Sequence, residues 1–384
     1  MHKLRVVADE NIPAIAASLG EMAAVQMIGG RQLVKRDLKG VDVLLVRSVT
    51  QVNETLLAGT DVKFVGTATS GFDHIDRAYL NAAGIGFAYA PGANANSVVE
   101  YVLAAIAAVG TKLEQLLEGG RLGIVGYGNI GAAMSRRCDA LGIACCVYDP
   151  WLDQQDIGNA ATLVEVLCCE VVSLHPELTR TAPWPSYHLL GVAELEQLNS
   201  DCLLINASRG AVIDNNALET QLNSSPRLQA VLDVWEGEPR INAGLLDRVR
   251  LGTAHIAGYS LDGKLQATQM LVRALLPQFG LKPLSDSFAG PELTPLQPPE
   301  HLSGAALLRW AIAQRYDIGR DDSLLRESVR GHSDNAAAVR FDRLRRNYRQ
   351  RRELLDSTVQ LSPSDPQDVD LLHALGCKIA PRER

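Results

Sequence analysis

A glycine-rich turn between an apolar run and a helical pattern limits most strongly what this chain can fold into. The turn reads Gly126-Tyr127-Gly128-Asn129-Ile130-Gly131, and it follows the apolar run that begins at residue 121. Gly126 permits a tight turn, Gly128 lets the backbone approach a pyrophosphate, and Gly131 lets helix and strand pack closely. The N-terminus of the following helix would face the anion. The motif predicts a dinucleotide site in which Gly126, Gly128, Asn129, Ile130 and Gly131 bind the cofactor.

Asp149 supports this prediction and indicates which dinucleotide is bound. It ends the next apolar run, 144–149, at about the spacing expected for a ribose-binding acid. Its carboxylate would accept hydrogen bonds from the ribose hydroxyls and repel a 2′-phosphate, so NAD is favoured over NADP. Taken alone, the glycine motif leaves two alternatives, a turn that binds no nucleotide and an S-adenosylmethionine site.

Short apolar runs alternate with helical patterns along the first 280 residues, which predicts two successive α/β units. Helices are expected at 97–117 and 265–279. Continuous apolar strands separated by helices are typical of parallel sheets covered on both faces. The expected strands are 4–9, 42–48, 62–69 and 85–91 in the first unit, and 121–128, 144–149, 171–175, 202–208, 228–234 and 249–256 in the second.

The composition changes after Gly280. Residues 281–300 are rich in Pro, Gly and Ser, which predicts a linker. Beyond it lies a separate segment with an amphipathic, Arg-rich stretch at 341–354. A length of 384 residues also favours two or three domains.

Charge and cysteine spacing exclude several classes of protein. The net charge of -7 argues against nucleic acid as a partner. The seven cysteines form no CxxC pair, so neither a disulfide framework nor a metal site is expected. The N-terminus lacks the apolar core of a signal peptide, and the longest apolar stretch, 98–109, is shorter than the roughly 20 residues of a membrane-spanning helix. We therefore expect a cytoplasmic protein that makes no membrane contact.

Three residues at the ends of predicted strands have the chemistry needed to oxidise a 2-hydroxy acid. Arg209 follows the run 202–208 and offers a guanidinium for a substrate carboxylate. His255 ends the last run and can take the hydroxyl proton as hydride leaves carbon 2. Glu238 can orient and tune that histidine. Each residue alone has a structural explanation, but together with the dinucleotide motif the three predict a catalytic site.

The segments SRGAVID, LDVWEGEP and HIAGY, in this order after GYGNIG, resemble the signatures of the D-isomer-specific 2-hydroxyacid dehydrogenases. The resemblance implies that Arg209 binds the substrate carboxylate, that His255 exchanges the proton, and that Glu238 hydrogen-bonds His255. It further implies that Asp233 contacts the nicotinamide amide. Ser208 and Gly258 are the remaining residues expected to contact NAD.

Further segments, including KFVGTATSGFDHID and YDIGRDDSLLR, resemble the subfamily that oxidises 4-phospho-D-erythronate in pyridoxal phosphate (vitamin B6) biosynthesis. By this resemblance Ser48, Thr69 and Tyr259 bind substrate, and Arg47 is a candidate partner for its phosphate. The subfamily also has a C-terminal dimerisation domain, which implies a homodimer.

The expected fold is therefore two doubly wound parallel-sheet domains, Rossmann-like or flavodoxin-like, plus a small C-terminal α+β dimerisation domain. The substrate domain is predicted at 1–97 with 257–285, the NAD-binding domain at 98–256, and the dimerisation domain at 286–384.

Two positions depart from the family pattern. Ala93 stands where the family usually has cysteine, and Pro176 follows His175 in a loop that otherwise contacts NAD. For this reason Pro176 is left out of the predicted site, and His175 is interpreted as structural.

Several alternatives remain open at this point. The Arg-rich stretch could be a solvated face, a dimer contact, which is preferred, or an arm that reaches the partner's active site. The substrate could be another D-2-hydroxy acid such as 3-phosphoglycerate, and a non-catalytic NAD-sensing protein is the alternative from another class.

Overall fold

The computed structural model describes residues 3–282, 291–362 and 366–382, which divide into two compact units. Unit 1 comprises Met1–Asn94 with Ser260–Glu292, and unit 2 comprises Ala95–Tyr259 with Leu293–Arg384. The C-terminal residues thus group with those of the predicted NAD-binding domain. The predicted boundary between 285 and 286 and part of the predicted linker, 283–290, lie outside the described residues.

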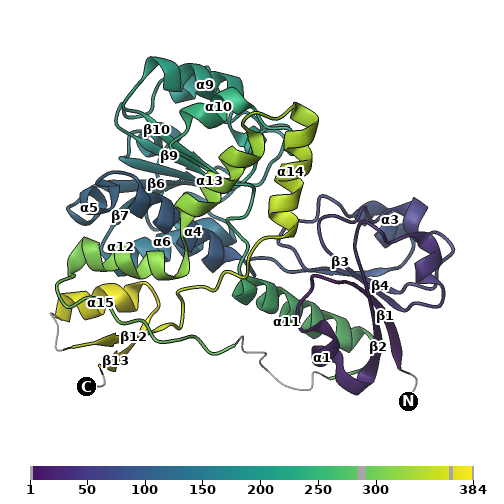
Figure 1. Ribbon diagram of the computed structural model, residues 1–384. Helices are drawn as coiled ribbons and strands as arrows, with labels where there is room; N and C mark the ends of the chain where they lie inside the picture. The colour runs from purple at the N-terminus through teal and green to yellow at the C-terminus, as the bar shows by residue number, and fades with distance from the viewer. Residues whose placement is uncertain (1–2, 283–290, 363–365, 383–384) are drawn as a thin grey trace. The chain divides into compact units, whose positions relative to one another are not determined.

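Unit 1 is built on a five-stranded parallel sheet in the order β2-β1-β3-β4-β5 (Figure 1). This is the order of a flavodoxin-like doubly wound sheet. The strands that occupy its middle, β3 and β4, are buried along their whole length, as their apolar sequences predict. The strands are β1 (Leu4–Asp9), β2 (Ala23–Ile28), β3 (Val43–Val46), β4 (Phe64–Thr67) and β5 (Gly86–Tyr89).

Helices cover both faces of this sheet. On one face Ile15 of α1 and Leu271 of α11 share an apolar layer with the strands, and on the other face Leu57 and Leu80 do so. Ser260 begins α11 by accepting the Gly263 N–H, a typical N-terminal cap. The helices of unit 1 are α1 (Ile15–Leu19), η1 (Gly20–Met22), η2 (Lys35–Leu38), α2 (Glu54–Leu57), α3 (Arg77–Ala82) and α11 (Leu261–Gln278).

Unit 2 contains a six-stranded parallel sheet in the order β11-β10-β9-β8-β6-β7. The chain reverses its direction of strand addition at β6, which lies between β7 and β8. Ligands of such sheets bind beyond the carboxyl ends of the strands at this point. The predicted fold of parallel-sheet α/β units is confirmed. The strands are β6 (Arg121–Val125), β7 (Ala144–Tyr148), β8 (Val171–Leu174), β9 (Leu203–Asn206), β10 (Gln229–Leu232) and β11 (Leu251–Gly252).

Two apolar layers enclose this second sheet. Residues of α4, α5 and α6 pack on one face, and residues of α7 to α10 pack on the other. The single helix predicted at 97–117 is wrong, because Gly110, at a φ of +52°, separates α4 from α5. The helices are α4 (Ala95–Ala108), α5 (Lys112–Leu117), α6 (Asn129–Leu141), η3 (Gln154–Asp156), α7 (Leu163–Leu167), α8 (Val192–Leu195), η4 (Gly210–Val212), α9 (Asn215–Ser224) and α10 (Ala243–Arg248).

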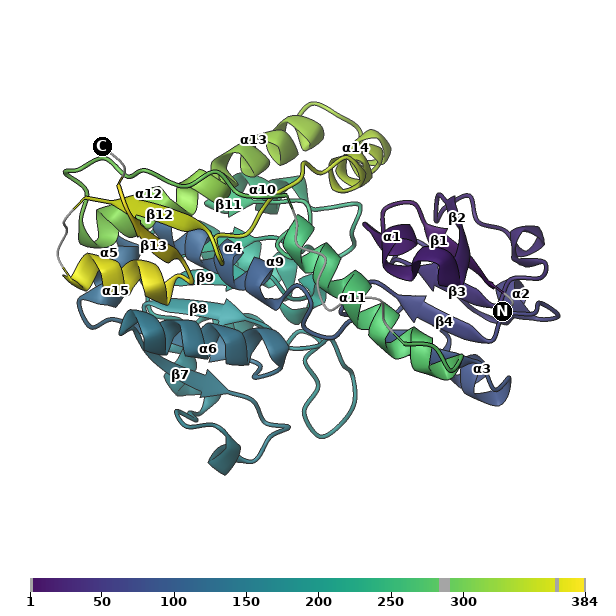
Figure 2. The ribbon, with the colours of Figure 1, turned by 90° about the horizontal axis from the view of Figure 1, so that it is seen from below.

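The described residues of the C-terminal segment add four helices and a two-stranded parallel sheet to unit 2 (Figure 2). Leu307 of α12 and Leu372 of α15 join the apolar layer formed by α4 and α6. The Arg-rich stretch is helical only as far as Arg346 and is then irregular. The elements are α12 (Gly304–Arg315), α13 (Ile318–Val329), α14 (Asp334–Arg346), β12 (Thr358–Leu361), α15 (Pro366–Ala374) and β13 (Lys378–Pro381).

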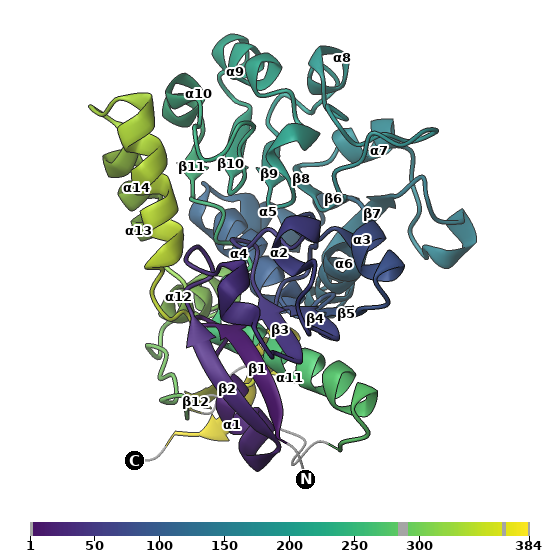
Figure 3. The same ribbon diagram turned by 90° about the vertical axis from the view of Figure 1, so that its right-hand side faces the viewer.

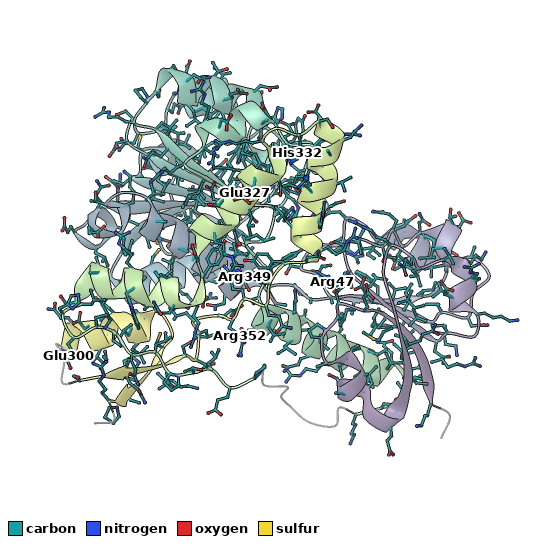
Figure 4. The ribbon with its side chains drawn as sticks, viewed as in Figure 1. Arg47, Glu300, Glu327, His332, Arg349 and Arg352 are labelled. Carbon is teal, nitrogen blue, oxygen red and sulfur yellow. The ribbon has the colours of Figure 1, made fainter. Side chains whose placement is uncertain are left out.

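Helix α13 covers the β11 edge of the six-stranded sheet (Figure 3). The Gly252 N–H of β11 donates to Asp322 Oδ1 at 2.7 Å. Arg326 pairs with Asp322 and donates to the carbonyl oxygens of Leu246 and Val249 at 2.7 and 3.0 Å. The first contact satisfies a backbone group that an exposed edge strand would offer to another chain, and the contacts of Arg326 satisfy carbonyl groups at the C-terminal end of α10.

A buried arginine connects the irregular stretch that follows α14 to the rest of unit 2. Arg351 is 1% exposed, and its Nη2 donates to the Ser97 and Ala257 carbonyl oxygens at 2.8 and 2.9 Å. Its guanidinium also lies 4.4 Å from the centre of the Tyr316 ring. Ser97 and Ala257 each lie within three residues of a point where the chain crosses between the units.

Two carboxylates complete this buried cluster. Glu353 accepts hydrogen bonds from the Ser97 hydroxyl at 2.5 Å and from Asn96 Nδ2 at 2.7 Å. Glu100 of α4 accepts the backbone N–H groups of Leu354 and Leu355. Burial, and after it the neighbouring Glu353 carboxylate, raises the pKa of Glu100 to about 7. The backbone N–H groups and the charge of Arg351 act in the opposite direction, so Arg351 favours the ionised form of Glu100.

Candidate active site

The glycine turn links β6 to α6, and the structure shows why two of its glycines are needed. Gly126 has a φ of +90°, and a Cβ there would lie 2.7 Å from the Pro176 backbone nitrogen. A Cβ on Gly131 would lie 1.9 Å from the Gly126 carbonyl oxygen. At Gly128 a Cβ would meet nothing within 4 Å. The first and third glycines allow close packing, while the second faces open space in which a ligand would fit.

Asp149 lies at the end of β7 beside this turn. Its Oδ2 accepts the Tyr127 N–H at 2.8 Å, and its Oδ1 accepts the Trp151 N–H at 3.0 Å. Asn129 and Ile130 form the first turn of the 13-residue helix α6. A helix N-terminus, an open glycine position and a strand-end carboxylate together fit a dinucleotide. The individual contacts of these residues with a cofactor stay predictions.

His255 and Glu238 form a direct pair. The distance between His255 Nδ1 and Glu238 Oε2 is 2.7 Å, and the Trp235 N–H donates to Glu238 Oε1 at 2.7 Å. Burial alone would raise the pKa of the Glu238 carboxyl. The charge and hydrogen bond of His255, the Trp235 N–H and the Arg345 guanidinium together lower this pKa instead. Glu238 is therefore an ionised carboxylate that orients the imidazole through Nδ1.

The loop that carries His255 is organised by Asp233, which is 1% exposed. Its Oδ1 accepts the Thr253 hydroxyl and the Ile256 N–H at 2.6 and 2.7 Å, and its Oδ2 accepts the Ala257 N–H at 2.9 Å. His255 adopts a φ of +55°. Such a conformation costs a non-glycine residue about 1–3 kcal/mol, and it is common at active sites. Both oxygens of Asp233 hold the loop, and its predicted contact with nicotinamide stays a prediction.

Arg209 follows β9, the strand beside β10. The turn that contains Arg209 and Gly210 packs closely against the loop that carries Glu238. A Cβ on Gly210 would lie 2.0 Å from the Trp235 carbonyl carbon, so only glycine fits there. Arg209 Nη1 donates to the Ser208 carbonyl oxygen at 3.0 Å. The Ser208 hydroxyl donates to Asn206 Oδ1 at 2.8 Å. The structure thus places Arg209 at the carboxyl end of the sheet, and the cofactor contact of Ser208 stays a prediction.

Tyr259 and Gly258 follow the His255 loop at the end of the first segment of unit 2. The Tyr259 ring meets the Tyr348 ring edge-on, with 5.9 Å between their centres. Arg345 of α14 also hydrogen-bonds Tyr259. The sequence analysis missed Arg345 and Tyr348, because only tertiary packing brings α14 to this loop.

In unit 1, three predicted substrate residues lie at the carboxyl ends of neighbouring strands. Arg47 and Ser48 follow β3, and Thr69 follows β4. The Thr69 hydroxyl donates to the Gly71 carbonyl oxygen at 2.7 Å. The structure adds Lys264 of α11, where burial, and after it the charge of Arg47, lowers the pKa to about 8. Arg47 and Lys264 are therefore two cations within electrostatic range of each other, an arrangement that favours an anion.

The loop that departs from the family pattern is packed against the glycine turn. Burial lowers the pKa of His175 to about 4, and its Nε2 lies 3.0 Å from the Ser173 hydroxyl. These contacts agree with a structural role for His175. Within the described ranges, no cluster of three or more His, Cys, Asp or Glu residues is placed to hold a metal ion. No helix among the described residues is long and apolar enough to cross a membrane.

Two family models match the chain. Residues 106–257 match the D-isomer specific 2-hydroxyacid dehydrogenase, NAD binding domain, and residues 289–376 match a domain of unknown function, DUF3410. Curated relatives named erythronate-4-phosphate dehydrogenase match almost the whole chain. The relative from Cellvibrio japonicus is 43% identical over 369 residues, which cover 94% of this chain and 95% of the relative. The relative from Salinibacter ruber is 40% identical over 377 residues, which cover 94% of each chain.

Solved structures share the fold. The NAD-bound 3-phosphoglycerate dehydrogenase of Entamoeba histolytica superposes with a TM-score of 0.60 at 23% identity, covering 72% of this chain and 95% of that one. A D-lactate dehydrogenase of Treponema pallidum superposes with a TM-score of 0.58 at 23% identity, covering 73% and 98%. At this level of identity the likeness concerns the fold alone.

Proposed function

Because the chain belongs to the erythronate-4-phosphate dehydrogenases, within the D-isomer-specific 2-hydroxyacid dehydrogenases, we propose that it oxidises 4-phospho-D-erythronate with NAD. The product is (R)-3-hydroxy-2-oxo-4-phosphooxybutanoate, in the synthesis of pyridoxal 5′-phosphate. The observation that carries the chemistry is the 2.7 Å contact between His255 Nδ1 and Glu238 Oε2.

In the proposed reaction His255 takes the proton of the carbon 2 hydroxyl through Nε2, because its Nδ1 is held by Glu238. NAD, when bound, accepts the hydride that leaves carbon 2. The resulting imidazolium is stabilised by the ionised Glu238 carboxylate. Arg209 holds the substrate carboxylate with its guanidinium, which suits a two-point contact.

The cofactor is held by the residues around β6 and β7. The α6 N-terminus and the backbone at Gly128 would bind the pyrophosphate, and Asp149 would bind the ribose hydroxyls. Gly258, in the loop that carries His255, and Asp233, which holds that loop, are proposed to lie at the nicotinamide end. The carboxylate of Asp149 supports NAD rather than NADP.

The substrate phosphate is proposed to bind in unit 1. Arg47 and Lys264 supply two charges, and Ser48 and Thr69 supply hydroxyl groups at the ends of β3 and β4. Charge-assisted hydrogen bonds of this kind suit a phosphate dianion. Tyr259, from unit 2, is the remaining residue proposed to contact substrate.

The direct test is NADH absorbance at 340 nm after mixing the protein, NAD and 4-phospho-D-erythronate. We expect turnover with this acid and much weaker turnover with 3-phosphoglycerate. The His255→Ala variant should bind NAD and form no NADH above background. Faster turnover of 3-phosphoglycerate would overturn the substrate assignment. NAD binding without turnover of either acid would favour an NAD-sensing protein.

We further infer that the chain forms a homodimer through its C-terminal segment and acts in the cytoplasm. The resemblance of residues 316–326 and 341–354 to the dimerisation segment of the subfamily supports the dimer. Sedimentation velocity at micromolar concentration should give the mass of two chains. A species with the mass of one chain would contradict the inference.

A further inference from the structure

One face of α14 is directed at the catalytic loops of its own chain. Ala338, Phe341 and Arg345 are spaced i, i+3 and i+7, so they lie on the same side of the helix. Phe341 is fully buried in the apolar layer that also contains Trp235 and Ala254. These two residues flank the loops that carry Glu238 and His255. Because Phe341 is packed there, Arg345, one helical turn further along α14, lies at the active site.

Arg345 makes polar contacts with residues of those loops. It hydrogen-bonds Tyr259 and lies within electrostatic range of the Glu238 and Asp233 carboxylates. Burial alone would lower the pKa of this guanidinium, but the charges and the Tyr259 contact raise it, so it stays a cation. Its neighbours Arg343 and Arg346 are exposed and make no contact of this kind among the described residues.

The contacts of Arg345 with the catalytic loops, more than its burial, distinguish it. Its buried Nε has no hydrogen-bond partner within the described part of the chain, but the structural residues Arg351 and His175 also have a buried nitrogen without one. An unpaired buried donor therefore does not by itself mark a functional group. The hydrogen bond to Tyr259 and the proximity to Glu238 instead connect Arg345 to two residues of the proposed site.

We propose that Arg345 is a positioning residue that holds the Tyr259 hydroxyl and adds to the charge that favours the ionised Glu238 carboxylate, so that the C-terminal segment completes the active site of its own chain. The inference rests on the proposed function, because it takes Glu238 and Tyr259 as parts of the catalytic site. A second cation beside Glu238 makes that carboxylate a weaker base. The proton that His255 takes from substrate then stays on the imidazole and does not pass to Glu238.

The test compares Arg345→Met with Arg345→Lys and with the exposed control Arg346→Met. We expect Arg345→Met to lower kcat/KM by about tenfold or more, as loss of tuning at an acid–base pair does. The acidic limb of its pH profile should move to higher pH, since the pKa of Glu238 rises when a nearby cation is removed. Arg345→Lys should have the acidic limb of its pH profile at the wild-type position. Arg346→Met should have the wild-type kcat/KM at every pH.

A second measurement does not depend on turnover. The carboxyl carbon of Glu238 can be titrated by NMR in protein labelled with ¹³C at glutamate, with Glu238→Gln assigning the signal. Its midpoint should be higher in Arg345→Met than in wild type and unchanged in Arg346→Met. An unchanged midpoint and an unchanged pH profile in a folded Arg345→Met protein would overturn the inference. A wild-type protein that fails to oxidise 4-phospho-D-erythronate but shows the expected midpoints would refute only the proposed substrate.

Discussion

Replacing the buried Arg351 with methionine should destabilise unit 2. Methionine retains much of the arginine stem but removes the donors to Ser97 and Ala257. It also takes one positive charge away from the buried Glu353 and Glu100 side chains, with Arg137 as the cation that still lies near them. The change therefore breaks a buried ionic cluster by removing one of its members.

The expected cost follows from the burial of this cluster. Removal of one partner from a buried ion pair costs about 3–5 kcal/mol, because the remaining charge is left uncompensated. With a urea m-value of about 3 kcal/mol/M, the unfolding midpoint should fall by about 1–1.7 M. The double variant Arg351→Met/Glu353→Gln should recover part of this loss, since the amide removes the carboxylate that Arg351 no longer compensates.

Tryptophan fluorescence is the suitable probe, because all four tryptophans lie in unit 2: Trp151, Trp184, Trp235 and Trp310. Urea titrations of wild type, Arg351→Met and the double variant should be compared with Arg343→Met, an exposed arginine on α14. The free energy of unfolding of the Arg343→Met control should stay within about 0.5 kcal/mol of the wild-type value. If Arg351→Met unfolds at the same urea concentration as this control, the buried cluster does not have the energetic role assigned to it.

Three further outcomes are expected. Glu238→Gln should lower kcat by about 100-fold with the KM for NAD nearly unchanged, because it weakens acid–base catalysis alone; an equal loss in NAD affinity would contradict the assignment. Asp149→Asn should weaken NAD binding by about tenfold and improve use of NADP, because the charge that repels a 2′-phosphate is removed. Unchanged KM values for both cofactors would show that Asp149 does not lie at the ribose. His175 is neutral when folded, with a pKa of about 4 against 6.5 unfolded, so stability should fall as pH drops from 6.5 to 4, by about 3 kcal/mol in total. Urea midpoints across this range should be flatter for His175→Gln, and equal slopes would refute the burial argument.

The buried parallel strands could be predicted from sequence, because a strand covered on both faces must be apolar throughout. Strands β3, β8 and β9 are examples. Strand β2 was missed because it is a sheet edge with several exposed positions in Ala23–Ile28. Strands β12 and β13 were missed as well, since each is short and only partly buried. The interruption at Gly110 was overlooked because the apolar pattern continues on both sides of it.

The site could be predicted where its residues follow strands directly. Arg209, Glu238 and His255 were identified in this way, and the structure pairs the last two. Lys264 and Arg345 could not be found, because each reaches its position through the packing of a helix distant in sequence. Nothing in the Arg-rich stretch distinguishes Arg345 from its neighbours until the burial of Phe341 fixes which side of α14 faces inward.

The contact between α13 and β11 affects the order in which the protein can form during its synthesis. Gly252 and its acceptor Asp322 are 70 residues apart in the chain. At a ribosomal rate of about 5–20 residues per second, roughly 4–14 s pass between the synthesis of Gly252 and that of Asp322. Strand β11 stays uncovered by α13 for at least this time. During that interval β11 is an uncovered edge strand that can pair with another polypeptide, and this risk of misassociation lasts until α13, which ends at Val329, has been synthesised.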